Sequence, residues 1–537
     1  EGLDIVAAGV NMTDAQDCVL ERCRLRYIDY TREPSTAKEP RGNIVTGKNN
    51  EWRNCLVAYA AGAGIRLAGE GNRLVNCVVH DVDYLGTGTG GLDLTSSVGA
   101  KVLHCSVFRT GRDTIRHHGS QRIRLEYNDI YLGNMLNNDA GGIYCWGTDG
   151  QGGIIAHNWV HDHLGDNTCG IYLDNFSRYF FVYNNVIWNC TGSGIRLNSD
   201  ATNHLVCNNT ITQTRQPFGT YCYHNYTPTM KGTRIVNNLV NALMDPRDPA
   251  QFVQGDLAPE LHHNSPGAVD RDGVPVKGSG AIDAGVEIPG ITDGYVGRAP
   301  DLGAYEYGGE RWVAGADWND PEAPPPPARD LSFSPRGPVT EDTMIADGLL
   351  LWLDANDATT LDLGPNNAVL AWRDKSPAKR VVQPDDPTRT VSLVTNALNS
   401  RPVVRGTGVG RLRIGTLRDE LGPVTALVIT QGLEAVGPPW QRIMACFTGD
   451  GQEWVLPNWI LLRPGGEKPE AYPARLFIVQ HRRGAALAGM TLLGASANKE
   501  QCLAGDVAEV LVFGRELRFD EFNALVEYLR TKWGLAD

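Results

Sequence analysis

Residues 142–145 read GIYC, residues 170–173 read GIYL and residues 194–197 read GIRL. Similar four-residue segments stand on both sides of them, at 64–67, 91–94, 114–117 and 219–222. Each is a short apolar run bounded by Gly, Asn or Asp, which is typical of strands and turns rather than of helices. A segment that recurs in this way indicates a repeat protein built from stacked β-strands.

A second signature supports the same repeat. It is a pair of residues between apolar neighbours, found at Arg22-Cys23, Asn54-Cys55, Asn76-Cys77, His104-Cys105, Tyr127-Asn128, His157-Asn158, Asn184-Asn185, Asn208-Asn209 and Asn237-Asn238. Successive pairs are about 22 to 32 residues apart, the range of solenoid repeats. The prediction is an all-β chain that begins with a right-handed parallel β-helix. We expect the Asn residues to bond to their counterparts in adjacent coils. The Cys residues should pack as small apolar groups rather than as metal ligands or disulfides, since no CxxC pair occurs.

Side chains alternate along a strand, so the residue between the two apolar positions of each four-residue segment should face outward. This outward row is Arg66, Asp93, Arg116, Tyr144, Tyr172, Arg196 and Tyr221. The next outward row is Ala68, Thr95, His118, Trp146, Asp174, Asn198 and Tyr223. Neighbouring strands lie about 4.8 Å apart, so the rows form ladders on one face. The mixture of Arg, Tyr, Trp, His and Asp at their centre predicts a functional surface.

Composition sets the domain organisation. The chain has 537 residues, so more than one domain is expected. Hydrophobic residues make up 42% of it, which is enough for a full core. We predict a β-helix over 1–318, a Pro-rich linker over 319–340 and a β-sandwich over 341–537 that ends in an amphipathic helix capped by Asp520. A loop at 30–43 could overhang the outward face, and irregular structure over 241–318 should close the last coil.

Charge and hydropathy limit the partners. The net charge of −13 and the absence of a basic patch argue against nucleic acid, and no apolar run is long enough to span a membrane. A monomer is expected. The chain opens abruptly with EGLDIVAAGV and shows no signal peptide, so we interpret it as a processed or truncated form of a secreted or periplasmic protein.

Three segments carry a family resemblance. The stretches GGIYCWGTDGQGGIIAHNWVHD, GIYLDNFSRYFFVYNNVIWN and GAIDAG…APDLGAYEYGG resemble right-handed parallel β-helix proteins that act on carbohydrates, a group of glycoside hydrolases and polysaccharide lyases. The second domain, with DGLLLWLDA and VAEVLVFGRELRFDEFNALVEYLRTKWGL, resembles laminin-G or concanavalin-like modules of secreted bacterial proteins, which implies an accessory or carbohydrate-binding role.

One motif of that resemblance bears on catalysis. The β-helix β-xylosidases have a Gly-Ile-aromatic-Leu-Asp strand whose Asp is the nucleophile, and GIYLD places Asp174 at that position. Their acid/base Glu lies about one coil later, where this chain has Asn198. A second acid must therefore come from elsewhere, or the chemistry differs.

Glycoside hydrolysis needs two carboxyl groups beside the glycosidic bond. Asp174 is the first candidate, and Asp139 and Asp149 flank the strand one coil earlier. The competing interpretation of Asp139 and Asp149 is that they cap turns. Asp200 is a weaker candidate further along.

The other outward residues are candidates for substrate binding. Tyr144, Trp146 and Tyr172 could form a platform for sugar rings or could stack between coils. Arg116 and Arg196 could bind a carboxylate or sulfate on the sugar, or pair with Asp residues of adjacent coils. His118 should face outward for acid–base chemistry or substrate bonding, and His117 should be buried.

No metal or other cofactor is expected. His161, Asp162 and His163 have a metal-binding composition. However, His80-Asp81 follows the signature Asn76-Cys77 at the same distance as His161-Asp162 follows His157-Asn158. The repeat therefore accounts for the His-Asp pair without a metal. Calcium held by Asp and Asn oxygens of the turns is left open.

The sequence thus predicts a glycoside hydrolase that acts on a polysaccharide, which could be anionic, through Asp174 and Asp139. The first alternative is a polysaccharide lyase with Arg116 or Arg196 as neutraliser and Tyr144, Tyr172 or His118 as base. The second is a non-catalytic protein that binds glycans or adheres to surfaces.

Overall fold

The structure is a computed structural model. It describes residues 1–28, 42–163, 165, 167–198, 200–221, 229–241, 255–334, 339–420, 422–432, 443–447, 453–456, 472–481, 487–494, 502–515, 517 and 519–535. The chain divides into two compact units, Glu1–Pro335 and Arg336–Asp537. The predicted overhanging loop falls almost entirely on residues outside this described part.

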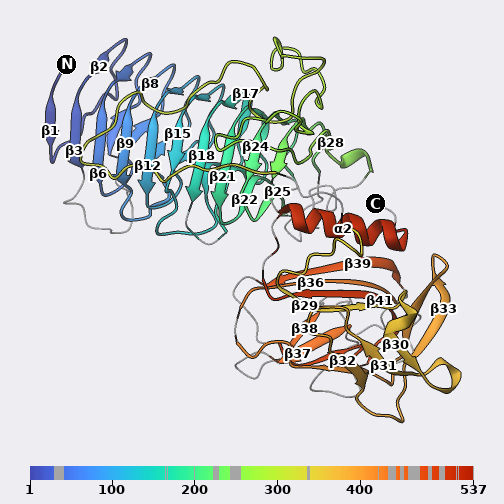
Figure 1. Cartoon of the computed structure of the whole chain (residues 1–537). Helices are drawn as coiled ribbons and strands as arrows, with labels where there is room; N and C mark the ends of the chain where they lie inside the picture. Colours follow the sequence, from blue (N-terminus) through green and yellow to red (C-terminus); the bar gives the residue numbers. More distant parts are fainter. Residues whose placement is uncertain are drawn as a thin grey trace. The chain divides into compact units, whose positions relative to one another are not determined.

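The first unit is a parallel β-helix, as predicted (Figure 1). In the described residues the strands form three parallel sheets of 10, 8 and 10 strands, and each of the central coils contributes one strand to each sheet. The first sheet contains β1 (Asp4–Val6), β3 (Arg24–Ile28), β6 (Leu56–Ala60), β9 (Val78–Val82), β12 (Ser106–Thr110), β15 (Asp129–Tyr131), β18 (Trp159–His163), β21 (Val186–Cys190), β24 (Thr210–Thr212) and β27 (Leu239–Asn241).

The second sheet carries the outward rows. It contains β4 (Asn43–Val45), β7 (Ile65–Leu67), β10 (Leu92–Asp93), β13 (Ile115–Arg116), β16 (Gly141–Cys145), β19 (Cys169–Leu173), β22 (Ser193–Leu197) and β25 (Gln216–Gly219). The third sheet contains β2 (Val19–Glu21), β5 (Glu51–Arg53), β8 (Arg73–Val75), β11 (Lys101–Leu103), β14 (Arg124–Glu126), β17 (Asp149–Ala156), β20 (Arg178–Tyr183), β23 (Leu205–Cys207), β26 (Arg234–Val236) and β28 (Glu260–His262).

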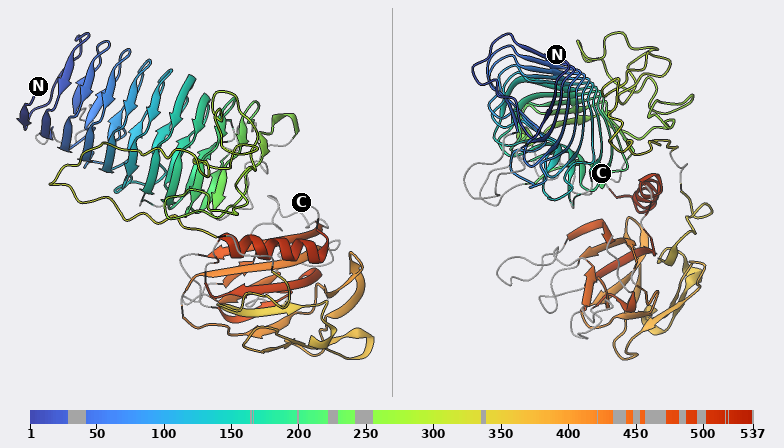
Figure 2. Two further views of the ribbon diagram at one scale, coloured as in Figure 1. Left: turned by 45° about the horizontal axis from the view of Figure 1, so that its top comes forward. Right: turned by 90° about the vertical axis from the view of Figure 1, so that its left-hand side faces the viewer.

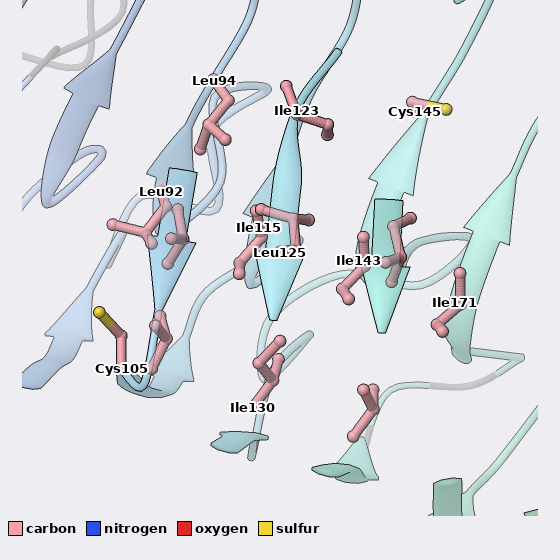
Figure 3. Packing of buried hydrophobic residues seen from close by; sticks show 14 of the residues in the cluster. Leu92, Leu94, Cys105, Ile115, Ile123, Leu125, Ile130, Ile143, Cys145 and Ile171 are labelled. Atoms are coloured by element: carbon pink, nitrogen blue, oxygen red, sulfur yellow. The ribbon is translucent and has the colours of Figure 1, made fainter. Parts of the chain in front are cut away.

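The core lies inside the coils. Ile, Leu, Val and Cys side chains of all three sheets point inward and pack layer on layer, as Figure 3 shows for Leu92, Ile115, Ile143 and Ile171. The signature cysteines are buried free thiols in this core, which confirms their predicted structural role. Burial of apolar side chains is the main favourable contribution to such a fold.

The two-residue signature has a physical explanation. Its first residue has a left-handed backbone in every coil, for example Asn76 with φ 53° and Asn184 with φ 52°. Asn tolerates this conformation better than most other residues, which accounts for its frequency there. The second residue then points inward, where the Asn side chains form the predicted ladder. Asn158 donates to Asn185 Oδ1 at 2.9 Å and accepts from the Asn128 amide at 3.0 Å.

The end of the first unit differs from the predicted linker. After η1 (Gly255–Leu257) and β28, the chain packs on the last coils, with Leu302 buried against Leu239. It then returns along the first sheet (Figure 2). Within the expected linker, Asp320 accepts a hydrogen bond from His80 Nε2 at 3.1 Å, and Leu331 is fully buried beside Val186. We call residues 310–334 the strap.

The second unit consists of antiparallel sheets, consistent with the predicted β-sandwich. One sheet contains β29 (Leu349–Asp354), β33 (Ser392–Leu398), β34 (Arg401–Thr407), β36 (Val424–Gly432), β39 (Tyr472–His481) and β41 (Ala504–Phe513). The other contains β30 (Leu361–Leu363), β31 (Val369–Arg373), β32 (Val381–Pro384), β35 (Leu412–Gly415), β37 (Met444–Phe447), β38 (Glu453–Leu456) and β40 (Ala488–Leu492). Short η2 (Ala358–Thr360) and η3 (Pro365–Asn367) lie between strands.

The terminal helix α2 (Phe519–Trp533) begins one residue earlier than predicted. Asp520 is therefore inside the helix and is not its N-cap. Among the described helices, none is long and apolar enough to cross a membrane.

Candidate active site

The outward row of the second sheet has the predicted register over its central strands. Arg116 of β13 is aligned with Tyr144 of β16, Tyr144 with Tyr172 of β19, and Tyr172 with Arg196 of β22. The flanking Ile and Leu residues of these strands are in the core. The row therefore places side chains from four consecutive coils on one face.

The predicted outward row is wrong at β25, the last strand of the second sheet. Arg196 is aligned with Gly219 of β25, not with Tyr221. Phe218 occupies the inward position against Ile195, because the strand is formed by QPFG rather than by the GTYC segment that resembles the motif. Tyr221 therefore lies beyond the row, and Tyr223 is outside the described residues.

Asp174 follows β19 directly and is the centre of a hydrogen-bond network. The Tyr144 hydroxyl donates to its Oδ2 at 2.9 Å, and the backbone N–H of Asn175 donates to its Oδ1 at 2.7 Å. The side-chain amide of Asn198 also donates to Oδ1 and, at 3.2 Å, to the Tyr172 hydroxyl. The structure thus brings together four predicted site residues: Tyr144, Tyr172, Asp174 and Asn198.

The environment of Asp174 raises its pKa. Burial of the half-exposed carboxyl is the main cause, and the donors around it oppose the shift without cancelling it. The nearby charge of Asp139 adds to the increase. Asp139 itself is exposed, two residues before β16, and its charge also acts on Tyr172 and Arg196. The charge of Asp139 therefore acts on the carboxyl group of Asp174, although the two differ in burial.

Asp149 lies at the start of β17, in the third sheet rather than the second. Its carboxylate forms an ion pair with Arg178 at 3.0 Å and accepts the Gln151 N–H at 3.2 Å. These contacts match the turn-capping interpretation. Asp200 similarly accepts hydrogen bonds from the Asn175 amide and the Phe176 N–H.

The aromatic residues divide into two kinds. Tyr144 and Tyr172 are only 9% and 3% exposed, because their rings pack against each other and Cys169. Their ring centroids lie 5.2 Å apart and the ring planes are tilted by 53°, so the two rings pack between coils without stacking face to face. Burial raises the pKa of both hydroxyls. Trp146 is 51% exposed and contacts Phe176 edge-on at 6.3 Å between ring centroids. Trp146 is the aromatic side chain of the three whose face is open.

The two adjacent histidines point in opposite directions, as predicted. His117 is fully buried, and its Nδ1 lies 3.2 Å from the Ser120 hydroxyl. His118 is half-buried, and its Nδ1 accepts the backbone N–H of Trp146 at 3.2 Å. Burial lowers the pKa of His118 to about 4, so its ring is neutral at pH 7 and its proton resides on Nε2.

The arginines of the row have different surroundings. Arg196 lies over the Tyr172 ring at 5.0 Å and donates to Asn198 Oδ1 at 3.3 Å. Arg66, nearer the N-terminus, pairs with Asp93 at 2.7 Å. Arg116 makes no hydrogen bond or ion pair within the described part of the chain, and its Nε is buried without an acceptor.

Asp113 is a further carboxyl group beside the outward row and is not among the predicted site residues. This residue precedes β13 and is fully buried, and its Oδ1 accepts the N–H of Gly141 at 3.2 Å. Its Oδ2 has no hydrogen-bond partner and lies 3.6 Å from Arg112 Nε. Burial raises the pKa of Asp113 to about 7, and its charge acts on Tyr144. A sequence signal exists: in the aligned positions of adjacent coils stand Gly90 and Gly141, so a carboxylate there is unusual.

The His-Asp pairs are bonded within the protein. His161 Nδ1 lies 2.6 Å from Asp162 and its Nε2 lies 2.9 Å from Asp129. His80 contacts Asp81 and Asp320 in the same way. Over the residues that the structure describes, no group of three or more His, Cys, Asp or Glu side chains is placed to hold a metal ion.

Comparisons with known proteins support the fold. Residues 90–244 match the family model described as "Right handed beta helix region", which covers less than half of the chain. No curated protein matches the sequence at a significant level.

Several solved structures are similar at low identity. Pectate lyase Pel9A has 15% identity and a TM-score of 0.39, over 53% of this chain and 77% of that one. Tailspike protein 2 of bacteriophage CBA120 has 10% identity and a TM-score of 0.35, over 98% and 75%. The A-module of the Azotobacter vinelandii mannuronan C-5 epimerase AlgE6 has 14% identity and a TM-score of 0.30, over 41% and 64%. At these values the similarities carry no information on the chemistry of this chain.

Proposed function

We propose that the face formed by β13, β16, β19 and β22 hydrolyses glycosidic bonds of a polysaccharide, with Asp174 as proton donor and Asp139 as the second carboxyl group. The observation that carries the proposal is that the carboxyl groups of Asp174 and Asp139 lie in different environments. Asp174 is half-buried with a raised pKa, whereas the neighbouring Asp139 is exposed. Two carboxyl groups in unlike environments suit the acid and the base or nucleophile of this reaction.

The contacts of Asp174 indicate where its proton would reside. Its Oδ1 faces donors that cannot accept, namely the Asn175 N–H and the Asn198 amide group. Its Oδ2 faces the Tyr144 hydroxyl, which can rotate from donating to accepting. A proton on Oδ2 is therefore tolerated, and from there it can pass to the leaving oxygen of a bound glycoside. Asp139 would then activate water or attack the sugar directly.

The neighbouring groups support substrate binding. Trp146 presents an open indole ring on the outward row that contains Asp174. An aromatic face of this kind packs against the apolar face of a sugar ring. His118, neutral and with its proton on Nε2, offers a hydrogen bond to a sugar hydroxyl. Asp149 has no role in the proposal, because Arg178 and the turn account for its contacts.

A polysaccharide lyase is the second candidate, and one observation favours it. The Tyr144 hydroxyl is bonded to the Asp174 carboxylate, which could accept its proton and make the phenolate a base. The raised pKa of Tyr144 opposes this role, and His118 carries its proton on the nitrogen that would have to act as base.

The test uses the intact protein, Asp174→Asn and Asp149→Asn on a panel of polysaccharides. Reducing ends and the ultraviolet absorbance of unsaturated uronates are followed together. The proposal predicts reducing ends without that absorbance, at least ~100-fold slower in Asp174→Asn and nearly unchanged in Asp149→Asn. Absorbance that rises with the reducing ends would establish the lyase instead. Retention on a glycan without any product would indicate a binding protein.

A further inference from the structure

The arginines of the second sheet differ in the groups that contact their guanidinium. Arg66 has the Asp93 carboxylate at 2.7 Å. Arg196 has the Tyr172 ring beneath it and the Asn198 oxygen beside it. Arg116 has neither, since no hydrogen bond or ion pair of its guanidinium is found in the described residues. It is nevertheless half-buried.

An unpaired and partly desolvated guanidinium is unfavourable, because removal of its hydration is not offset by a counter-charge or by acceptors. Arginine is also the side chain best shaped to bind carboxylate or sulfate through two parallel hydrogen bonds. Arg116 therefore has the surroundings expected of a side chain that awaits an anion.

The other charged groups near Arg116 form no ion pair with it in the described residues. Asp93 of β10 is aligned with Arg116, but its carboxylate is paired with Arg66 at 2.7 Å. Asp113 is close enough to interact, but burial raises its pKa to about 7, so it is only partly ionised at neutral pH, and Arg112 lies beside it at 3.6 Å. His118 is neutral. The coil that contains β13 thus presents positive charge, whereas the acidic Asp139 and Asp174 belong to the next two coils.

We infer that Arg116 binds an acidic group, carboxylate or sulfate, on the substrate, so that the polysaccharide cleaved by this face is anionic. The inference rests on the proposed function. The strands β13 and β19 are two coils apart, about 10 Å at the usual strand spacing. The acidic group recognised by Arg116 therefore belongs to a sugar beside the bond cleaved at Asp174. The glycan accordingly runs along the axis of the β-helix.

The experiment separates binding from cleavage by using full-length Asp174→Asn, in which hydrolysis is suppressed. Affinity electrophoresis is run in gels that contain polygalacturonate, alginate or chondroitin sulfate, and in gels that contain neutral xylan or galactan. Arg116→Gln is added to this background. Arg122→Gln is the matched control, since it removes the same charge from the same coil, on the side of the third sheet.

The expected result is retardation by at least one acidic glycan and not by the neutral ones. Arg116→Gln should weaken this affinity at least ~10-fold and Arg122→Gln less than ~2-fold, and the retardation should fall as salt is added. Arg116→Lys, which keeps the charge without the two parallel donors, should be intermediate. Unchanged melting temperatures would show that the variants are folded.

Several outcomes would overturn the inference: retention only by neutral glycans, no retention by any glycan, or equal losses in Arg116→Gln and Arg122→Gln. Failure of the inference and failure of the proposed function give different results. Arg116-dependent binding of an acidic glycan that the intact protein does not cleave would keep the inference and reject hydrolysis. Cleavage of a neutral glycan that is unaffected by Arg116→Gln would keep hydrolysis and reject the inference.

Discussion

At the scale of single residues, Asp113 and Asp174 show how burial sets the chemistry of a carboxyl group. Asp174 remains half-exposed and is surrounded by donors, so it can exchange a proton with a ligand. Asp113 is fully enclosed and holds the start of β16 through the Gly141 N–H, with one oxygen unbonded. The first suits a catalytic acid, and the second suits a residue that positions the strand carrying Tyr144.

The pKa of Asp113 leads to a prediction about stability. Folding raises this pKa from an ordinary value near 4 to about 7, despite the opposing charges of Arg112 and Arg116. The folded state therefore retains a proton that the unfolded chain releases, and this stabilising contribution is lost as the pH rises from about 4 to about 7. At pH 4 the Asp113→Asn variant should have a melting temperature close to that of the native protein. At pH 7.5 its melting temperature should be higher, which corresponds to a free energy of unfolding larger by on the order of 1–4 kcal/mol.

Thermal melting of both proteins across this pH range measures the effect. A difference in melting temperature that does not change with pH would show that Asp113 is already ionised in the folded state at low pH.

The sequence predicts some residues of the site better than others. Asp174 could be found because its motif ends a strand whose alternation is clear. The burial of Tyr144 and Tyr172 could not, because alternation tells which side of a sheet a ring faces but not how tightly the next coil packs on it. Asp113 was missed because it precedes the strand, where the chain turns and alternation no longer applies.

At the scale of elements, the Asn ladder links successive coils through hydrogen bonds in the interior. Asn158 is fully buried, accepts from Asn128, and donates to Asn185 and the Leu125 carbonyl. Asn264 forms an outer rung and is only partly buried. Loss of an interior rung leaves several buried groups unpaired, whereas water can replace an outer one.

We therefore expect Asn158→Ala to destabilise the β-helix by about 2–4 kcal/mol and Asn264→Ala by about 1 kcal/mol or less. The midpoints of urea unfolding, followed by circular dichroism, give the comparison. Equal shifts for the two variants would mean that the ladder adds no stability beyond that of its individual side chains.

The strands and their register were largely predictable, since each coil repeats the same two patterns. The exception is β25, where Gln216–Gly219 forms the strand and Phe218 fills the inward position. Phe218 offers a larger apolar surface to Ile195 than the small and polar residues of GTYC do, and burial of that surface favours the observed register.

At the scale of the whole chain, the strap was the least predictable part. Its Pro-rich composition predicts an extended segment but does not reveal that the segment has partners. Those partners are distant in sequence: Trp318 donates to the Asn76 carbonyl, and Asp320 bonds to His80. The first compact unit therefore ends at Pro335 rather than near residue 318. A role of the second unit in carbohydrate binding stays a prediction.

The most direct test of the account compares kcat/KM for Asp174→Asn, Asp139→Asn, the double variant and Asp149→Asn on a polysaccharide that the intact protein cleaves. Asp174 and Asp139 are proposed to act as one unit, so each single variant should lose at least ~100-fold, and the double variant should be scarcely worse than the poorer single one. Asp149→Asn should stay within a few-fold of the native protein. Near-native activity in Asp139→Asn, or a loss in Asp149→Asn as large as that in Asp174→Asn, would contradict the acid pair.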